Sequence, residues 1–286
     1  MSTQATDALR SRIEDTSIRT VGLYAALYGV AALFLVPYAW MISLSLKPRS
    51  EMFSRVPHWI PSEPTLQWYQ YVLSESLILQ WTLNTLLIAG ITTLVVLLFD
   101  SLIAFSLTRL DWPGRKFVLS VIIASFMVPA YVNIVPLYTL VSDLGLISSY
   151  AGVILPLTAG PLGVFLLVQF FRDFPDELEE AARLDGFSTF RIYSRLMLPM
   201  MKSPLTALAL FTFVSSWNQF LWPLIVLQSE GSYTLPIGLV TLSSSQVFQP
   251  GLMMAATLIA SLPLFVVFLL LQDYLINAIQ IQGTKG

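Results

Sequence analysis

Long apolar runs dominate this sequence and restrict what the chain can fold into. A helix needs about 20 consecutive, mostly apolar residues to cross roughly 30 Å of hydrocarbon. Six runs of about that length occur, near 21–46, 82–107, 117–140, 150–171, 205–227 and 251–275. Only 11% of the residues are charged, against about 25% in soluble domains. The sequence therefore predicts an all-α membrane protein with six transmembrane helices.

The Lys and Arg residues are divided unevenly between the two sets of connections. Cytoplasmic segments hold the excess of these residues in membrane proteins. Twelve of the 15 lie in the tail 1–20, the connection after the second run, the loop 172–202 and the tail 281–286. The other set of connections holds only Lys47, Arg49 and Arg55. We therefore expect both termini and the loop 172–202 to be cytoplasmic.

Residues that carry most enzyme and metal chemistry are scarce. The chain has no cysteine and a single histidine, His58, which excludes thiol catalysis, iron–sulfur clusters and a histidine-based metal site. No pair of carboxylates lies within the apolar runs, so the usual catalytic constellations are missing. The net charge of −2 gives no indication of nucleic-acid binding, which favours a clustered basic face. We expect no catalytic residue and no metal site in this chain.

The loop 172–202 has the sequence of two short helices joined by a turn. Pro175 followed by acidic residues is typical of a helix start, and Gly186 suits the left-handed residue that ends a helix. Ser188 is placed to cap a second helix over 189–197, which Pro199 breaks or kinks. On the first helix, we expect an apolar side of Leu178, Ala181, Ala182 and Leu184 and a polar side of Glu179, Glu180, Arg183 and Asp185. Such a loop is either a solvated connector or a docking surface for a soluble partner.

The docking interpretation gains weight from a family pattern. Glu180-Ala181-Ala182, then Gly186, then Leu196-Met197-Leu198-Pro199 resembles the EAA motif of ABC-importer permeases, which reads E-A-A, three residues, G, nine residues, I-x-L-P. The spacing matches throughout, and Leu196 replaces the usual isoleucine. Further segments resemble the carbohydrate branch, in particular the smaller permease of maltose-type systems: Ser43–Pro48, Leu107–Leu110, Pro113–Arg115, Pro136–Tyr138, Leu144–Leu146, Trp217–Pro223 and the Gly-Thr-Lys-Gly end.

The resemblance implies the type I importer architecture, with a permease domain over 21–280 and a cytoplasmic coupling helix. It implies a non-enzymatic subunit of a prokaryotic plasma membrane that forms half of the pathway for a sugar or sugar-like solute. A second permease, two ATP-binding subunits that hold ATP and Mg²⁺, and an extracytoplasmic binding protein would be its partners. This chain itself would hold no cofactor. The coupling residues carried over from the motif are Glu180, Ala181, Ala182, Asp185, Gly186, Leu196 and Pro199. A permease for a non-sugar solute and an ion-coupled transporter are the alternatives.

Several polar residues fall inside the predicted spans. Buried polar groups in a membrane are costly and often functional. Asp100 either bonds structurally to Ser101, Asn84 or a partner subunit, or lines the pathway. Candidate pathway residues are Asp100, Asn133, Trp217, Asn218 and Gln219. The uncharged ones suit sugar hydroxyls and sugar rings, but hydrogen bonds between helices explain them equally well.

Overall fold

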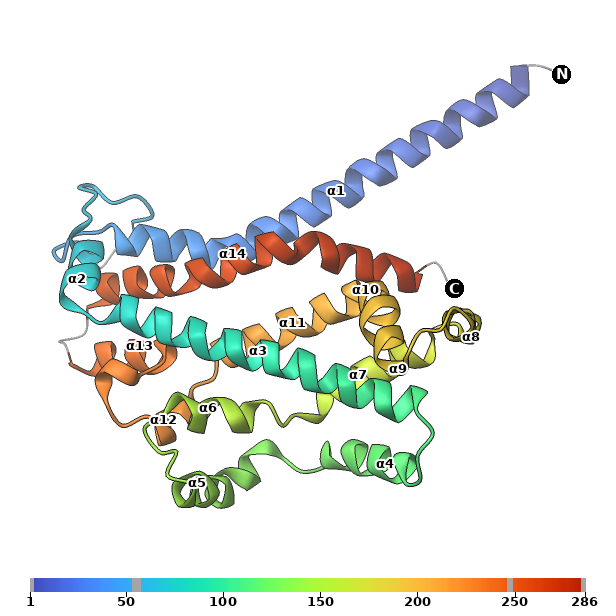
Figure 1. The fold of residues 1–286 in the computed structure, drawn as a ribbon. Helices are drawn as coiled ribbons and strands as arrows, with labels where there is room; N and C mark the ends of the chain where they lie inside the picture. Colours follow the sequence, from blue (N-terminus) through green and yellow to red (C-terminus); the bar gives the residue numbers. More distant parts are fainter. Residues whose placement is uncertain (1–2, 53–57, 246–248, 284–286) are drawn as a thin grey trace. The chain divides into compact units, whose positions relative to one another are not determined.

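In the computed structural model, which describes residues 3–52, 58–245 and 249–283, the chain is built from helices, and none of these residues lies in a strand (Figure 1). Arg55 and Lys285, used in the orientation argument, lie outside the described residues. The elements in chain order are α1 (Thr3–Ser45), α2 (Gln67–Glu75), α3 (Ile78–Arg109), α4 (Arg115–Ser125), η1 (Ala130–Asn133), α5 (Ile134–Asp143), α6 (Tyr150–Leu157), α7 (Pro161–Arg172), α8 (Asp176–Leu184), α9 (Thr189–Arg191), η2 (Ile192–Met197), α10 (Leu198–Met200), α11 (Lys202–Trp217), α12 (Leu221–Val226), η3 (Glu230–Ser232), α13 (Leu235–Ser245) and α14 (Pro250–Gly283).

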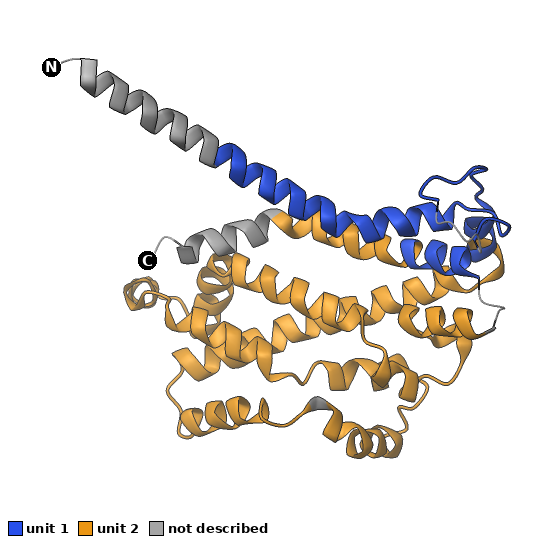
Figure 2. Cartoon of the chain, turned by 180° about the vertical axis from the view of Figure 1, so that it is seen from behind, with its two compact units in different colours: residues 1–72, 248–258 blue, residues 73–247, 259–286 orange. Residues whose placement is uncertain are grey.

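The chain forms two compact units, which Figure 2 colours separately. The first comprises residues 1–72 and 248–258. Inside it, the buried Lys47 donates a hydrogen bond to the carbonyl of His58 and lies 4.8 Å from the centre of the Trp40 ring. The Trp68 indole donates to the Lys47 carbonyl at 2.7 Å. A buried ammonium is thus matched to a carbonyl and an aromatic face, two groups that stabilise a cation away from water.

The second unit, residues 73–247 and 259–286, is organised around α3. This helix makes its most extensive contacts with α7 and α11, and it also packs against α6 and α13 (Figure 1). Its buried residues recur every three or four positions and include Ile88, Thr92, Val96, Asp100 and Ala104, so they form one stripe on the helix. Many of them are small or polar. Helix association in lipid relies on close packing and hydrogen bonds, because lipid tails are as apolar as leucine.

The predicted spans are only partly continuous helices. Thr20–Ser45, Ile78–Arg109 and Pro250–Gln272 are long and apolar enough to cross a membrane. Two bent pairs, α6 with α7 (42°) and Thr189–Met200 with α11 (78°), raise the number to at most five in the described part of the chain. The run 117–140 is divided into α4, η1 and α5, with a break at the extended Pro129. The count of six therefore stays a prediction.

Breaks fall where proline or a polar turn interrupts an apolar run. The run 150–171 is interrupted between Pro156 and Pro161, since α6 ends at Leu157 and α7 begins at Pro161. In the run 205–227, the helix is interrupted at 218–220, before Pro223, which lies in the first turn of α12. Proline fits a first turn because its missing N–H has no intrahelical partner there. These breaks line a common cavity, described below.

Candidate functional site

The segment 172–202, called here the coupling loop, begins with the helix α8. The turn after α8 is closed by two hydrogen bonds, from Gly186 N to the Arg183 carbonyl (3.0 Å) and from Phe187 N to the Ala182 carbonyl (2.9 Å). Gly186 has a φ of +78°. Together these features form a Schellman motif, in which glycine supplies the left-handed residue. The predicted role of Gly186 as the residue that ends this helix is confirmed.

The second half of the coupling loop contains a wide helical turn. Ser188 accepts a hydrogen bond from Arg191 N, which confirms the predicted N-cap. Residues Ile192–Met197 then form the π-helix η2. Pro199 cannot donate to the Arg195 carbonyl and would clash with it in a regular α-helix, so the wider turn accommodates the proline. The chain bends at Met201 before α11.

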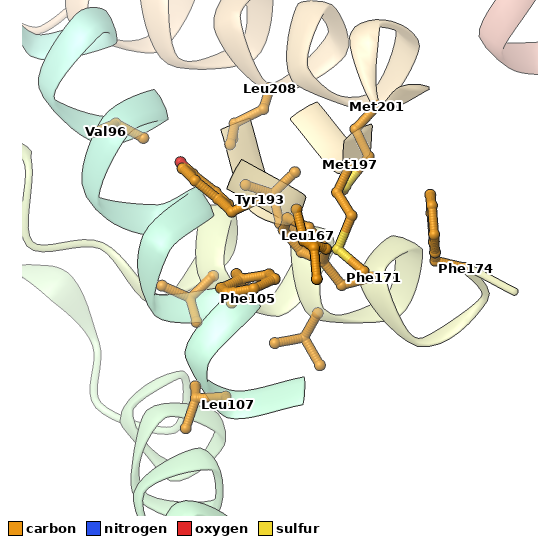
Figure 3. Close-up of a cluster of buried hydrophobic side chains, with 14 of the residues drawn as sticks. Val96, Phe105, Leu107, Leu167, Phe171, Phe174, Tyr193, Met197, Met201 and Leu208 are labelled. Carbon is orange, nitrogen blue, oxygen red and sulfur yellow. The ribbon is translucent and has the colours of Figure 1, made fainter. Parts of the chain in front are cut away.

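The coupling loop is fixed to the rest of the second unit by a cluster of buried hydrophobic side chains, called here the Tyr193 cluster (Figure 3). Tyr193 of the loop packs within it. Its ring lies 5.2 Å from the Phe105 ring, and its hydroxyl shares a 2.8 Å hydrogen bond with Ser101 of α3. Met197 and Phe171 are fully buried beside it. The loop is therefore packed onto α3 and α7 and is not a loose solvated connector.

Arg109, the last residue of α3, ties the end of α7 to the start of α8. Its guanidinium donates to the carbonyls of Phe171 and Phe174, the latter at 2.6 Å. It also pairs with Asp176 at 2.5 Å and lies 3.6 Å from a Glu179 oxygen. Glu179 in turn pairs with Arg183 at 2.7 Å. The carbonyls at and just after the end of α7 and the acidic first turn of α8 thus share one cation.

The outward side of the coupling loop carries the motif residues. Glu180, Ala181 and Asp185 are exposed, whereas Glu179 and Ala182 are buried. The predicted division of α8 is therefore wrong for four residues. Glu179 belongs to the packed side because Arg109 and Arg183 neutralise it. Leu178, Ala181 and Leu184 (89% exposed) belong to the exposed side. Phe190 extends the exposed apolar surface to α9.

A second feature is a cavity of about 150 Å³ between α3, α7 and α11. It lies beside both interruptions, since Gly160 precedes α7 and Gln219 follows α11. Asp100 lines it and is 3% exposed. The predicted structural bonds of Asp100 are not present: Ser101 bonds to Tyr193, and Asn84 bonds to Gly231, Tyr233 and Tyr150. Asn84 is also more than four helical turns away along α3.

Comparison with known proteins places the chain in a family. The family described as "binding-protein-dependent transport system inner membrane component" matches residues 100–281. The chain belongs to this family. It is therefore a membrane-spanning permease component of a transport system and not an enzyme. The match includes the coupling loop and the cavity-lining parts of α7 and α11.

Relatives of the permease cover nearly its whole length. It is 35% identical over 274 residues to the arabinooligosaccharides transport system permease protein AraQ of Bacillus subtilis, covering 94% of this chain and 97% of AraQ. It is 30% identical to the melibiose/raffinose/stachyose import permease protein MelC of the same organism, covering 94% of this chain and 98% of MelC.

A solved structure shows the fold. A chain from the crystal structure of a bacterial ABC transporter involved in the import of the acidic polysaccharide alginate has a TM-score of 0.78 and 22% identity to this permease. The alignment covers 90% of this chain and 97% of the other. The predicted all-helical architecture of a type I ABC-importer permease is thus confirmed.

The structure brings together only some of the predicted pathway residues. Asp100 and Gln219 line the same cavity. Trp217 is buried and stacks on Phe213, and Asn218 donates to the Val214 carbonyl of its own helix. Asn133 is exposed at the end of η1 and does not line the cavity. The roles of all these residues stay predictions.

Three residues important to the geometry were absent from the predicted set: Arg109, Tyr193 and Gly163. The partners of Arg109 lie 62 or more positions later in the chain. A pairing over such a distance leaves no periodic pattern in the sequence. Tyr193 could have been suspected, because it and Met197 are apolar residues four positions apart on the predicted second helix. Gly163 lies two residues after Pro161, but the sequence does not show that an aspartate from another helix approaches it.

Proposed function

We propose that this permease forms half of the translocation pathway of an ATP-driven importer for oligosaccharides or similar sugar-like solutes, and that its coupling loop docks an ATPase subunit. The observation that carries the proposal is the surface of the loop. Glu180 and Ala181 are exposed on a helix whose opposite side is held by Arg109. The sugars named for AraQ and MelC support the solute class.

The chemistry of the exposed side suits a soluble protein partner. Leu184 and Phe190 are 89% and 69% exposed, and large apolar side chains at the water-exposed end of a helix bundle indicate a contact surface. Ala181 allows a partner to approach α8 closely. Glu180 and Asp185 offer carboxylates to cationic groups at the rim of that contact.

The proposed partners follow from this arrangement. A second permease, different from this chain, completes the pathway as a heterodimer. An extracytoplasmic binding protein delivers the solute on the other side of the membrane. Two ATPase subunits bind ATP and Mg²⁺, and this chain holds no cofactor. With both termini cytoplasmic, the coupling loop faces the ATPases. The residues in contact are Glu180, Ala181, Asp185 and the exposed apolar side chains, while Ala182, Gly186, Leu196 and Pro199 shape the loop.

Motion passes through the coupling loop only if the loop is stiff. Closure of the ATPase dimer around ATP displaces α8, and a flexible connection would dissipate that displacement. Here the Schellman turn, the Arg109 contacts and the Tyr193 cluster join α8 to α3, α7 and α11. Movement at the coupling loop is thereby transmitted to the helices that line the cavity.

Glu180→Lys tests the docking proposal. The full transporter, with both permeases, the ATPases and the binding protein, is reconstituted in proteoliposomes. We expect Glu180→Lys to lower sugar-dependent ATP hydrolysis and uptake at least tenfold and to reduce co-purification of the ATPase, because an interfacial like-charge contact costs several kcal/mol. Membrane insertion is expected to be unchanged.

Asp143→Lys is the matched control, since Asp143 is an exposed acid at the end of α5, away from the loop. It is expected to transport like the unmodified protein. If Glu180→Lys and Asp143→Lys behaved alike, the coupling loop would not be the docking surface.

The solute class is tested by uptake of arabinotriose and raffinose, representing the classes named for AraQ and MelC. Accumulation of one or both is expected, dependent on ATP and the binding protein. Binding-protein-dependent uptake of an amino acid or peptide instead would favour the non-sugar alternative. Uptake driven by an ion gradient without ATP would contradict the whole proposal.

A further inference from the structure

The cavity between α3, α7 and α11 contains polar groups that no neighbouring group satisfies. Asp100 has no hydrogen bond or ion pair within the described part of the chain, although its side chain is almost completely buried. The hydroxyls of Thr92 and Ser216 line the same cavity and are buried without a partner. Unpaired buried polar groups are rare in native proteins and cost free energy. Three around one cavity indicate that something polar occupies it.

Thr92 differs from the other threonines of its own helix. A threonine inside a helix ordinarily donates to the carbonyl one turn earlier. In α3 this bond is made by Thr82, Thr85, Thr93 and Thr108. Thr92 lies beside Thr93 and does not make it. Its hydroxyl is therefore available to the cavity.

The position of Asp100 depends on the start of α7. A Cβ at Gly163 would overlap the Asp100 carboxylate, so the glycine makes room for it. Gly163 lies in the first turn of α7, which begins at Pro161. The N–H groups and the positive end of the helix dipole lie there, and they favour an adjacent carboxylate. The carboxylate can therefore remain next to the cavity without a basic side chain.

The lining identifies the chemistry of the occupant. One carboxylate accepts hydrogen bonds, the hydroxyls of Thr92 and Ser216 donate and accept, and the Gln219 amide does both. No Lys, Arg or His lines the cavity, and the half-exposed Phe211 ring supplies an apolar wall at its mouth. An uncharged ligand with several hydroxyl groups and an apolar ring face fits this set. The cavity of about 150 Å³ has the volume of an engineered cavity that holds one benzene molecule, so it has room for one sugar ring at most and not for a longer chain.

We propose that the cavity beside Asp100 is a binding subsite for a single sugar unit of the transported oligosaccharide, located in this permease itself. Asp100 and Gln219 would bond its hydroxyls, and Phe211 would contact the face of the ring. This inference rests on the proposed function. It adds a residue-level sugar site that neither the family match nor the relatives' names assign.

The test uses the absence of cysteine from this chain. Ser215 lines the cavity and is exposed, so Ser215→Cys introduces a unique thiol at the site. In the reconstituted transporter, maleimide labelling of this chain is followed by mass spectrometry, with and without arabinotriose or raffinose. We expect the transported sugar to slow labelling of Ser215→Cys at least threefold. Ser229→Cys, in the exposed segment before η3, should be labelled equally with and without sugar.

Second changes in the Ser215→Cys background test the named residues. In Asp100→Asn, we expect the sugar concentration that gives half-maximal protection to rise about tenfold or more. The reason is that this variant loses a hydrogen bond to a charged group. Thr92→Val is expected to raise it by less. The matched control is Thr93→Val, because Thr93 bonds within its own helix and does not line the cavity. Co-purification with the partner subunits verifies that each variant is assembled.

Each result decides the proposal. Sugar-dependent protection that Asp100→Asn weakens and Thr93→Val does not would support it. A transported sugar that leaves Ser215→Cys labelling unchanged would overturn the subsite while the proposed function stands. Protection by NaCl or KCl without sugar would overturn it in favour of a cation site. If neither sugar were transported, the proposed function would fail and the subsite with it.

Discussion

At the scale of single residues, Arg109 illustrates how a buried cation can organise a connection. Its side chain is 7% exposed, and such a charge is stable only when its donors are matched. Two backbone carbonyls and Asp176 accept hydrogen bonds from its N–H groups, and a Glu179 oxygen lies 3.6 Å away as an ion pair. The Phe174 ring lies 5.6 Å from the guanidinium carbon. Asp176 is 82% exposed, so this ion pair adds little. The carbonyls and Glu179 provide most of the restraint.

Arg109→Ala is therefore expected to loosen α8 from α7. We expect a loss of about 3 kcal/mol in stability, because buried acceptors and Glu179 lose their partner. The amount of ATP hydrolysed per sugar molecule transported should rise, because the coupling loop becomes less stiff. Thermal unfolding and the ratio of hydrolysis to uptake in proteoliposomes measure both effects. Arg115→Ala is the control, because the partners of Arg115, the exposed Asp111 and the Leu110 carbonyl, are local and outside the coupling loop. Equal losses in the two variants would exclude this role for Arg109.

Local chemistry made some residues predictable and others not. Gly186 and Ser188 could be placed from the sequence because helix ends select particular residues within a few positions. Glu179 was placed on the wrong side of α8 because its partner Arg109 lies far away in the chain. The cavity at Asp100 was equally hidden, since it requires Gly163 and Ser216 from two other helices.

At the scale of elements, the coupling loop combines a tight turn with a wide one. Gly186 reverses the chain after α8, and η2 lets Pro199 follow without a clash. These two features determine which side of each short helix faces the Tyr193 cluster. The spacing of the EAA motif can be understood in these terms. The glycine and the proline shape the backbone, and the residues between them fill the cluster or stay exposed.

Substitutions at Gly186 separate backbone shape from side-chain size. No atom lies within 4 Å of a Cβ built there, so Gly186→Ala suffers only the strain of a left-handed residue, about 1 kcal/mol. Gly186→Asn should cost less, because asparagine tolerates that conformation. Hydrogen exchange of the amides of 184–192 should therefore increase more in the alanine variant. A greater effect of the larger asparagine would show that space, not backbone conformation, matters at this position.

At the scale of the whole molecule, the apolar runs predicted a membrane protein with an all-helical fold. They did not predict where the membrane-spanning helices are interrupted. A hydropathy window averages across interruptions such as those at 158–160 and 218–220. It also gave no indication that 235–245 forms a helix of its own, α13. In the second unit, the ends of α3 are tied to different parts of the chain. Arg109 bonds to the coupling loop, and Asn84 bonds to the carbonyls of Gly231 and Tyr233.

A substitution at the contact between α3 and α13 tests whether close helix packing stabilises the second unit. A Cβ at Gly238 of α13 would overlap the buried Trp81 indole, whose N–H donates to the Glu230 carbonyl at 2.9 Å. Gly238→Ala is expected to cost about 1–3 kcal/mol through overpacking, and to lower the thermal unfolding midpoint of the purified transporter. Gly90→Ala is the control, since no atom lies within 4 Å of its Cβ and alanine favours a helix by up to about 1 kcal/mol. The midpoint should stay equal or rise in that variant. A drop with Gly90→Ala as large as that with Gly238→Ala would mean that helix flexibility, not the Trp81 contact, explains the need for glycine.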